Sequence, residues 1–398
     1  MDITITPGTL SGIVQAIPSK SQAHRLMICA AFSDTYTYLE CPQTNADIDA
    51  TAGCLNALGA DVQRTGDGYQ VKPIKNIPNA AVLDCGESGS TLRFLLPIVC
   101  ALGVETTFQM KGRLPYRPLS PMWEELERMG CCLTRPTETT IRTTGKLQAG
   151  TFSLSGKVSS QFITGLLFAT ALLNGTSQIT VTDTLESKSY VEMTQLALKT
   201  FGVDTNNYRV SGSFPFHSPG KLKVEGDWSN GAFWLAANAL NNHLTITNLD
   251  AKSPQGDRVS AEILKNLEEN ITVSAADIPD LVPVLAVIAG AKKGAVFTDI
   301  ARLRLKESDR VAAVCNMLNN FGATAFSDEN TLTVLPGKYH SCTINAVNDH
   351  RIAMSAAIAA TAADGPVTII GAECVAKSYP AFWQVYKELG GKYEQHIR

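Results

Sequence analysis

The sequence predicts a two-domain α/β (α+β) protein built from six related units. One helix-ending pattern recurs along the chain, and a β-like segment follows each copy. The copies lie far enough apart for a unit with two helices and several strands, which is larger than a solenoid repeat. With 44% hydrophobic and 18% charged residues over 398 positions, the chain can bury cores of that kind.

The recurring pattern is an amphipathic helix that ends at Leu, Met or Phe and is followed by glycine. Glycine most readily adopts the left-handed conformation that closes a helix. The copies are "LNALGADV" (55–62), "LERMGCCL" (126–133), "LKTFGVDT" (198–205), "LNNFGATA" (318–325) and "YKELGGKY" (386–393). The expected capping residues are Gly59, Gly130, Gly202, Gly322 and Gly390.

The spacing of these glycines indicates one irregular unit. Successive glycines are 71, 72, 120 and 68 residues apart, and the gap of 120 fits neither one full unit nor two. A degenerate copy, "LKNLEENITV" (264–273), lies in that gap with Glu in place of Gly. We therefore expect six units, with the fourth cut short before "IPDLVP".

Six units divide naturally into two domains of three. The start "MDITITPGTLSGIVQ" is typical of a strand-like leader, and "LKVEGDWSNGAFWLAANAL" (222–240) is expected to begin the fourth unit. We predict a discontinuous domain at 1–17 plus 227–398 and a continuous domain at 18–226. Repetition alone predicts a fold and not a function, because a structural protein could be built the same way.

Composition excludes several classes of protein. The formal net charge of −3 argues against general nucleic-acid binding, which needs a net basic face. The chain shows no signal peptide and no apolar run of membrane-spanning length, so we expect a cytoplasmic protein. Ten scattered Cys without a CxxC motif indicate reduced thiols, and six scattered His without a His/Cys cluster do not predict a zinc site.

Polar clusters stand at the predicted helix starts. A helix start attracts anions through its free N–H groups and dipole, although Ser, Thr, Asp and Asn also cap ordinary helices. Arg93, Arg310 and Arg351 fall in first turns, where the dipole disfavours cations. This placement predicts ligands with substantial negative charge, such as phosphate or carboxylate. The loop "GESGST" (86–91) matches neither the Walker pattern nor GxGxxG.

Two residues are left with two interpretations each. Asp280 in "IPDLVPVL" (278–285) is either a helix cap or a proton-transfer group whose pKa burial has raised. His350 in "NDHR" is either a substrate-side group or a capping residue that fixes Arg351. For a further pair, Asp47 and Asp49, helix-start charges are expected, and Asp49 could orient Arg25 or Lys20.

A set of short motifs carries a family resemblance from Pro18 to Pro380. In order they are "PSKS…R", "GESGSTLR", "RP" (117–118), "SSQF", "IPD", "KESDR", "NDHR" and "AKSYP". Together they resemble the 5-enolpyruvylshikimate-3-phosphate (EPSP) synthase family of enolpyruvyl transferases. The resemblance implies a two-domain inverse α/β barrel-like fold with six βαβαββ repeats, here with the fourth truncated, and substrates bound in the interdomain cleft.

The resemblance also implies a reaction. The enolpyruvyl group of phosphoenolpyruvate is transferred to the 5-hydroxyl of shikimate 3-phosphate through a tetrahedral intermediate that loses inorganic phosphate. This step belongs to the shikimate pathway, which leads to chorismate and the aromatic amino acids. The family needs neither a metal nor an organic cofactor. The implied partners are therefore the two small substrates, with no nucleic acid and no membrane, and we expect a monomer.

The residues of the site are implied by position in these motifs. The residues expected to hold shikimate 3-phosphate are Lys20, Ser21, Arg25, Ser159, Ser160, Gln161, Ser187, Asp280 and Lys306. The residues expected around phosphoenolpyruvate are Lys20, Gly89, Arg93, Arg117, Gln161, Arg310, Arg351 and Lys377. The expected proton-transfer groups are Asp280, Glu307 and Lys20.

The chain departs from the family pattern at two charged positions. Glu87 adds a carboxylate beside an expected anion site, which is unfavourable unless it points away or pairs with a cation. Arg302 stands where the family has an Asn that contacts shikimate 3-phosphate, so that role is not carried over.

Two other functions remain open from sequence. The first is enolpyruvyl transfer to UDP-N-acetylglucosamine, whose enzymes carry a reactive Cys on a mobile loop. Cys131 and Cys132 follow a predicted helix cap and are expected to be buried, which disfavours this alternative. The second is a non-catalytic ligand-binding relative, which would keep the helix caps and lose the cations. The retention of Lys20, Arg25 and Lys377 argues against it.

Overall fold

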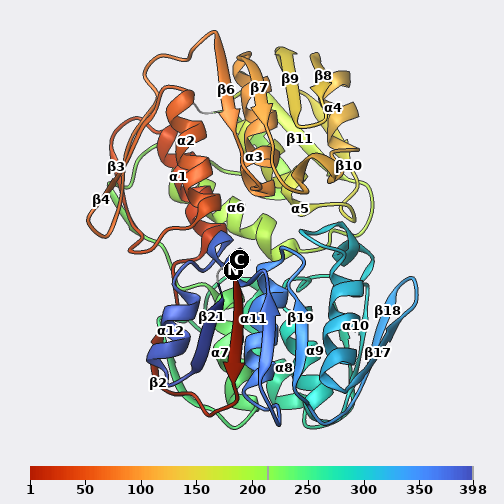
Figure 1. Cartoon of the computed structure of the whole chain (residues 1–398). Helices are drawn as coiled ribbons and strands as arrows, with labels where there is room; N and C mark the ends of the chain where they lie inside the picture. The colour runs from red at the N-terminus through yellow and green to blue at the C-terminus, as the bar shows by residue number, and fades with distance from the viewer. Residues whose placement is uncertain (213–214, 397–398) are drawn as a thin grey trace. The chain divides into compact units, whose positions relative to one another are not determined.

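The computed structural model describes residues 1–212 and 215–396, and the chain forms two compact units. Unit 1 comprises Met1–Ile17 and Glu225–Arg398, and unit 2 comprises Pro18–Val224. The second boundary lies two residues before the position expected from sequence. In unit 1 the red N-terminal strand lies beside blue C-terminal strands (Figure 1).

The middle repeat of unit 2 shows the complete βαβαββ pattern that the resemblance implies. Its sheet has the strand order β6-β7-β9-β8, in which β6 and β7 are parallel and the other pairs are antiparallel. Its elements are β6 (Ala80–Asp84), α3 (Gly89–Leu102), β7 (Glu105–Gln109), α4 (Met122–Arg128), β8 (Cys131–Thr137) and β9 (Thr140–Gly145).

The other two repeats of unit 2 are variations on this pattern. One has the sheet β13-β3-β5-β4, and the other has the three-stranded sheet β10-β11-β12. The first contains α1 (Lys20–Ala31), β3 (Thr37–Glu40), α2 (Ala46–Ala57), β4 (Asp61–Thr65), β5 (Gly68–Lys72) and β13 (Lys221–Lys223). The second contains β10 (Thr151–Leu154), α5 (Ser160–Ala171), β11 (Thr176–Val181), α6 (Lys188–Thr200) and β12 (Arg209–Ser211).

Unit 1 contains two four-stranded repeats. Their sheets have the orders β15-β16-β18-β17 and β19-β20-β1-β21. The first contains β15 (Ile271–Ser274), α9 (Val282–Ala291), β16 (Ala295–Thr298), α10 (Arg310–Phe321), β17 (Thr324–Ser327) and β18 (Thr331–Leu335). The second contains β1 (Asp2–Thr6), β19 (Cys342–Asn345), α11 (His350–Ala360), β20 (Val367–Ile370), α12 (Phe382–Glu388) and β21 (Lys392–His396).

The fourth repeat is truncated, as the sequence predicted. Its sheet has only two described strands, β2 (Ser11–Gln15) and β14 (His243–Thr247), with helices α7 (Trp228–Ala239) and α8 (Ser260–Asn266). After α8 the chain passes directly to β15, which belongs to the next sheet. The segment 222–240 supplies helix α7 of this repeat, but its strand belongs to another sheet. β13 pairs with β3 in unit 2, and β2 from the N-terminus takes the place beside β14.

The predicted capping glycines are confirmed. Gly59, Gly130, Gly202, Gly322 and Gly390 all have positive φ, between 83° and 105°. Two of them also lie against backbone oxygens, since an added Cβ would stand 2.8 Å from Asn76 O at Gly59 and 2.7 Å from Lys338 O at Gly322. The repeated sequence pattern therefore marks a repeated backbone turn that other residues would strain.

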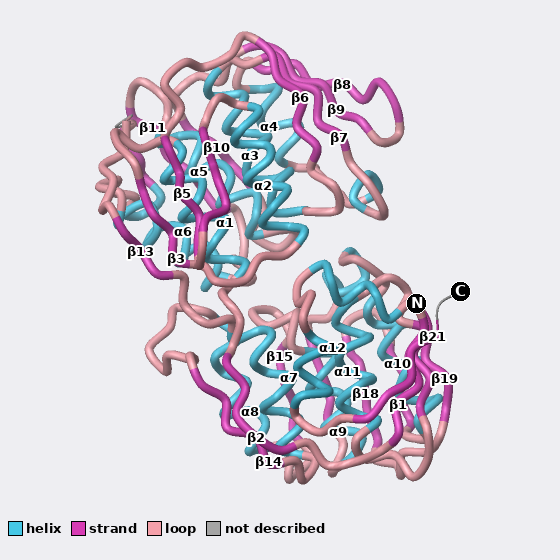
Figure 2. The backbone as a smooth tube through the Cα atoms, turned by 60° about the vertical axis from the view of Figure 1, so that its left-hand side comes forward, coloured by secondary structure: helices cyan, strands magenta, loops and turns pink. Residues whose placement is uncertain are grey.

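The central helices are buried on all sides, which places the hydrophobic cores between the sheets. Every residue of α11 is buried, as are nine of the ten in α9. In each unit the cyan helices run between groups of magenta strands (Figure 2). Such a helix has no polar face to show to solvent, so its first turn is where polar side chains are accommodated. Across residues 1–212 and 215–396, no helix is long and apolar enough to cross a membrane.

Candidate active site

The start of α1 presents Lys20 beside a buried carboxylate. Ser19 caps the helix by accepting from the Gln22 backbone N–H. The Lys20 Nζ lies 2.8 Å from Asp47 Oδ2 in the first turn of α2. Asp47 and Asp49 both lie in the first turn of α2, as expected. The alternative that Asp49 orients Lys20 or Arg25 was wrong, because Asp49 accepts from the Thr44 and Tyr69 hydroxyls at the surface. An i,i+2 step along α2 turns the two carboxylates to different faces.

Arg25 is a buried cation held by neutral oxygens. Its guanidinium donates to Thr194 Oγ1 at 2.8 Å, to Ser21 O at 2.7 Å and to Tyr190 O at 2.8 Å. Arg25 is 2% exposed, and no carboxylate in the described part of the chain forms an ion pair with it. Burial lowers the pKa of Arg25 to about 10. A desolvated cation with only neutral partners is suited to receive an anion.

Gly89 leaves the space into which two guanidinium groups converge. It is the first residue of α3, after the cap Ser88, whose hydroxyl accepts from Thr91 N. An added Cβ at Gly89 would lie 2.7 Å from both Arg93 Nη1 and Arg117 Nη1. The two cations therefore meet at a helix start, where backbone N–H groups also point outward.

Gln161 joins α5 to this group. Its amide oxygen accepts from Arg93 Nη1 at 3.0 Å, and its amide nitrogen donates to Ser90 Oγ at 3.0 Å. Sequence reasoning missed the residue that allows this contact: a Cβ at Gly165 would lie 2.3 Å from Arg93 O, so glycine lets α5 approach α3. A conspicuous glycine inside an apolar helix was the available signal.

The remaining serines occupy two helix starts in unit 2. Ser159 caps α5 by accepting from Gln161 N, and the next residue, Ser160, is buried. Ser187 occupies the position just before α6 in a left-handed conformation with φ of 55° and is buried, but its side chain does not cap the helix. The structure thus brings serine hydroxyls to the starts of the same helices that supply Gln161 and the partners of Arg25.

The additional carboxylate of Glu87 lies against a neighbouring loop. A Cβ added to Gly112, which has φ of 57°, would stand 2.6 Å from Glu87 Oε1. The carboxylate therefore rests on the backbone of the loop that continues to Arg117. Alanine at position 112 would require the Glu87 side chain to move.

In unit 1 a single buried guanidinium joins three carboxylates. Arg310, 1% exposed, donates to Asp280 Oδ1 at 2.6 Å, to Glu307 Oε2 at 2.6 Å and to Asp349 Oδ2 at 2.8 Å. Asp349 also accepts from Ser308 Oγ at 2.9 Å. Asp349, which precedes His350 in the "NDHR" motif, is therefore the fully buried anchor of Arg310.

The surroundings of Asp280 decide its protonation. Burial alone would raise its pKa, but the charges of Arg351, Lys306 and Arg310 together hold that pKa well below its usual range. Of the two interpretations given for Asp280, the one in which burial raises its pKa is therefore wrong for the protein without ligands. Three nearby cations outweigh the loss of water.

Lys306 is a partly buried lysine with a lowered pKa. Its ammonium lies 3.6 Å from Asp280 Oδ1. The pKa of Lys306 is lowered to about 8, mainly by burial; the attraction of Asp280 opposes this shift, and repulsion from Arg302 and Arg310 adds to it. Arg302, which departs from the family pattern, thus lowers the pKa of Lys306, a residue proposed to bind substrate.

Arg351 is fixed from two directions. It donates to Asp280 O at 3.0 Å and to Asp280 Oδ2 at 3.1 Å. Asp349 caps α11 by accepting from Arg351 N at 3.0 Å. The capping role considered for His350 therefore belongs to the preceding residue, Asp349. Lys377 lies at the end of a short 3₁₀ helix, Ala372–Lys377, and is half-buried.

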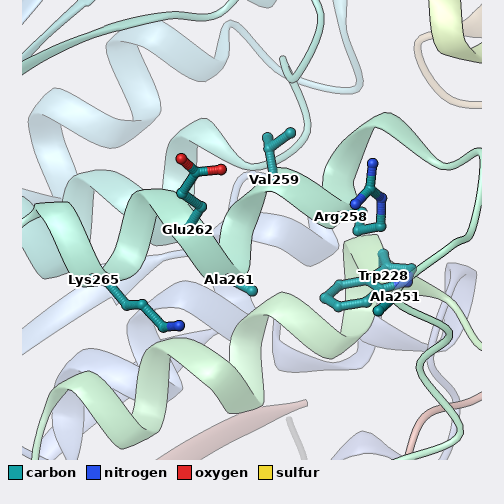
Figure 3. Close-up of a pocket in the computed structure, with 7 residues that line it drawn as sticks. All are labelled: Trp228, Ala251, Arg258, Val259, Ala261, Glu262 and Lys265. Carbon is teal, nitrogen blue, oxygen red and sulfur yellow. The ribbon is translucent and has the colours of Figure 1, made fainter.

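Other features of the described chain lie outside these two groups. A hollow of about 390 Å³ in unit 1 is lined by Trp228, Ala251, Arg258, Val259, Ala261, Glu262 and Lys265, and none of the predicted substrate residues is among them (Figure 3). Across residues 1–212 and 215–396, no group of three His, Cys, Asp or Glu side chains could hold a metal ion. In β8, Cys131 is buried as expected, whereas Cys132 is exposed, because alternate residues of a strand face opposite sides.

The chain is similar to proteins of one enzyme family. Residues 5–386 match the sequence model of EPSP synthase (3-phosphoshikimate 1-carboxyvinyltransferase). The curated 3-phosphoshikimate 1-carboxyvinyltransferases of Clostridium kluyveri and Clostridium acetobutylicum are each 38% identical to it. Those alignments cover 99% and 98% of this chain, and 98% and 97% of the two relatives.

Solved structures show the same fold. EPSP synthase from Acinetobacter baumannii is 22% identical with a TM-score of 0.80, covering 99% of this chain and 100% of that chain. The enolpyruvyl transferase NikO from Streptomyces tendae is 16% identical with a TM-score of 0.78, covering 99% of this chain and 98% of that chain. These likenesses confirm the predicted fold class, which at such identities is all that they carry.

Proposed function

This chain belongs to the EPSP synthase (3-phosphoshikimate 1-carboxyvinyltransferase) family, and we propose that it transfers the enolpyruvyl group of phosphoenolpyruvate to the 5-hydroxyl of shikimate 3-phosphate. It is a transferase of the shikimate pathway, which serves aromatic amino acid biosynthesis. The names of the curated relatives favour this activity over transfer to UDP-N-acetylglucosamine. The observation that carries the proposal is the gathering of buried or half-buried cations at helix starts, at the positions of the family motifs.

The charges of the substrates explain why so many cations are needed. Each substrate carries a phosphate and a carboxylate, and both must come close together before they react. Two unit charges 4 Å apart repel by about 4 kcal/mol at an effective dielectric of 20. Arginine and lysine side chains offset this repulsion when they surround both ligands.

Shikimate 3-phosphate is assigned to the helix starts of α1, α5 and α6. Arg25 supports this assignment most strongly, because it is buried and holds only neutral oxygen partners. The proposed ligands in unit 2 are Lys20, Ser21, Arg25, Ser159, Ser160, Gln161 and Ser187. Asp280 and Lys306 of unit 1 complete the proposed set.

Phosphoenolpyruvate is assigned to the cations around Gly89. The convergence of Arg93 and Arg117 over that glycine supports the assignment, since a carboxylate or phosphate can accept from two guanidinium groups at once. Arg310, Arg351 and Lys377 of unit 1, with Lys20, are proposed to complete this set. Gln161 is proposed to touch both ligands, because it already binds Arg93.

Residues from both units are thus proposed to act on one pair of substrates. Binding both ligands would then draw on cations from both units, and exclusion of water would strengthen each interaction.

Proton transfer is assigned to Asp280, Glu307 and Lys20. The reaction must remove a proton from the 5-hydroxyl and deliver one to C3 of phosphoenolpyruvate. Asp280 and Glu307 share Arg310 in the free protein, which keeps both close to the cation that the ligand is proposed to engage. An anionic ligand competes for Arg310 and Arg351, which raises the pKa of Asp280 toward a useful value for a base.

The proposed function is tested by the dependence of phosphate release on both substrates. The purified protein should release phosphate only when shikimate 3-phosphate and phosphoenolpyruvate are both present. Mass spectrometry should then detect the enolpyruvyl ether of shikimate 3-phosphate. Phosphate release from phosphoenolpyruvate alone, or none with both, would contradict the proposal.

We also propose that the enzyme acts as a monomer in the cytoplasm. All ten cysteines are free thiols, which suits a reducing compartment. Sedimentation velocity with and without both ligands tests the oligomeric state, and a dimer of fixed stoichiometry would contradict it.

A further inference from the structure

A chain of hydrogen bonds runs through buried side chains of α1, α2 and the start of α3. His24 Nδ1 lies 2.7 Å from Thr51 Oγ1, and Thr51 Oγ1 lies 2.7 Å from Thr91 Oγ1. The Thr91 hydroxyl then donates to Ser88 Oγ at 2.7 Å. None of the four residues is more than 1% exposed. Such a chain links three helices through groups that solvent cannot satisfy.

The direction of the protons along this chain follows from counting donors. Each hydroxyl carries one proton, and that of Thr91 is donated to Ser88. Thr91 must therefore accept from Thr51, which leaves Thr51 with no proton for the imidazole. His24 must then donate from Nδ1–H to Thr51, so its Nε2 is the unprotonated nitrogen.

The surroundings of His24 agree with a neutral ring in this tautomer. The pKa of His24 is lowered to about 3, mainly by burial; the charge of Asp47 opposes this shift, and those of Lys20 and Arg25 add to it. His24 Nε2 has no hydrogen-bond partner among the described residues. In this tautomer the partnerless Nε2 carries no proton. In the other tautomer Nε2–H would be a buried donor without an acceptor, which is costly.

The two ends of the chain adjoin the two proposed substrate groups. His24 precedes Arg25, and Ser88 precedes Gly89. Phe94 of α3 contacts both His24 and Arg25. Its ring meets the His24 ring edge-on with the centroids 6.3 Å apart, and the Arg25 guanidinium lies 5.0 Å from the Phe94 centroid. The hydrogen-bond chain therefore couples the α1 start to the loop that carries Gly89.

We propose that His24, Thr51 and Thr91 are positioning residues that fix Ser88, and with it the phosphoenolpyruvate-binding start of α3, relative to α1. This inference rests on the proposed function, because it assigns the Gly89 group to phosphoenolpyruvate. Ser88 accepts from both the hydroxyl and the backbone N–H of Thr91, so the loop is held by two bonds to one residue. Loss of the hydroxyl bond leaves only the helix cap.

The kinetic test uses substitutions of equal size. Thr51→Val and Thr91→Val each break the chain without changing side-chain volume appreciably. The loss of one such bond corresponds to about a 3- to 10-fold rise in the KM for phosphoenolpyruvate, with the KM for shikimate 3-phosphate little changed. Thr91→Ser restores a hydroxyl and should restore the KM.

A matched control separates positioning from stability. Thr170 of α5 is also fully buried and donates only within its own helix, to Leu166 O and Leu167 O. Thr170→Val should lower stability by a similar amount and leave both KM values unchanged. Wild-type KM values in Thr51→Val and Thr91→Val, or an equal rise in Thr170→Val, would overturn the proposal.

A second readout does not depend on turnover. Nitrogen-15 NMR of histidine-labelled protein should show His24 protonated at Nδ1 and unprotonated at Nε2 between pH 5 and 8. Protonation at Nε2 instead would refute the proton order and the chain. If wild-type protein releases no phosphate, the proposed function fails while this measurement still decides whether the chain exists.

Discussion

Substitution of Gly89 by alanine tests the convergence of Arg93 and Arg117 most sharply. The new Cβ would lie 2.7 Å from both Nη1 atoms, whereas an ordinary contact is about 3.4 Å or longer. Each guanidinium must therefore move by roughly 0.7 Å. A misplacement of about 1 Å can cost as much as 100-fold in rate, so we expect kcat/KM for phosphoenolpyruvate to fall about 10- to 100-fold.

Stability should change in the opposite direction. Gly89 does not have a positive φ, so its backbone accepts alanine, and at the first helical position the preference for alanine is smaller than the value of about 1 kcal/mol for helix interiors. The variant should therefore fold at least as well as wild type in urea titrations, with the KM for shikimate 3-phosphate nearly unchanged.

The matched control is Gly53→Ala in α2. That glycine is also helical, and an added Cβ meets nothing within 4 Å. It should gain stability without any kinetic effect. A Gly89→Ala enzyme whose KM for phosphoenolpyruvate stays within twofold of wild type would refute the reasoning.

Three further predictions concern the charged groups. Above pH 8 Lys306 loses its proton and its attraction for an anion, so the KM for shikimate 3-phosphate should rise there; Lys306→Arg, measured across pH 7 to 10, should abolish that rise, and an unchanged profile would count against it. Asp349→Asn leaves Arg310 short of its fully buried partner and should lower the free energy of unfolding by about 3 kcal/mol in urea, against little change for exposed Asp328→Asn. Lys20→Met and Arg25→Ala should abolish phosphate release while circular dichroism stays native; wild-type rates in both would rule out their assignment.

The repeat architecture was predictable because it is written in local chemistry. A glycine with positive φ is required wherever the helix closes, so Gly59 and Gly322 carry the same signal at distant positions. The truncation was visible for the same reason, as a missing interval between such glycines. The exchange of strands could not be predicted. β2 and β13 pair with strands more than 180 residues away, and the sequence of a short strand does not determine which strand it pairs with.

The sequence predicted which residues form the site better than it predicted their protonation and their hydrogen-bond partners. Motif order pointed to Arg310 and Asp280, but the pKa of Asp280 depends on cations that arrive from elsewhere in unit 1. The anchoring role of Asp349 and the choice of Asp47 over Asp49 depend on which helix face is turned inward. Such facts belong to packing between helices, which spacing along one helix does not determine.

Calorimetric titration of shikimate 3-phosphate, with and without an unreactive analogue of phosphoenolpyruvate, tests the central claim most directly. Cations from both units are proposed to neutralise both ligands together, so each ligand should increase the affinity for the other by the same factor, which we expect to be at least about tenfold. Independent affinities, with the same dissociation constant for shikimate 3-phosphate in both titrations, would contradict the account.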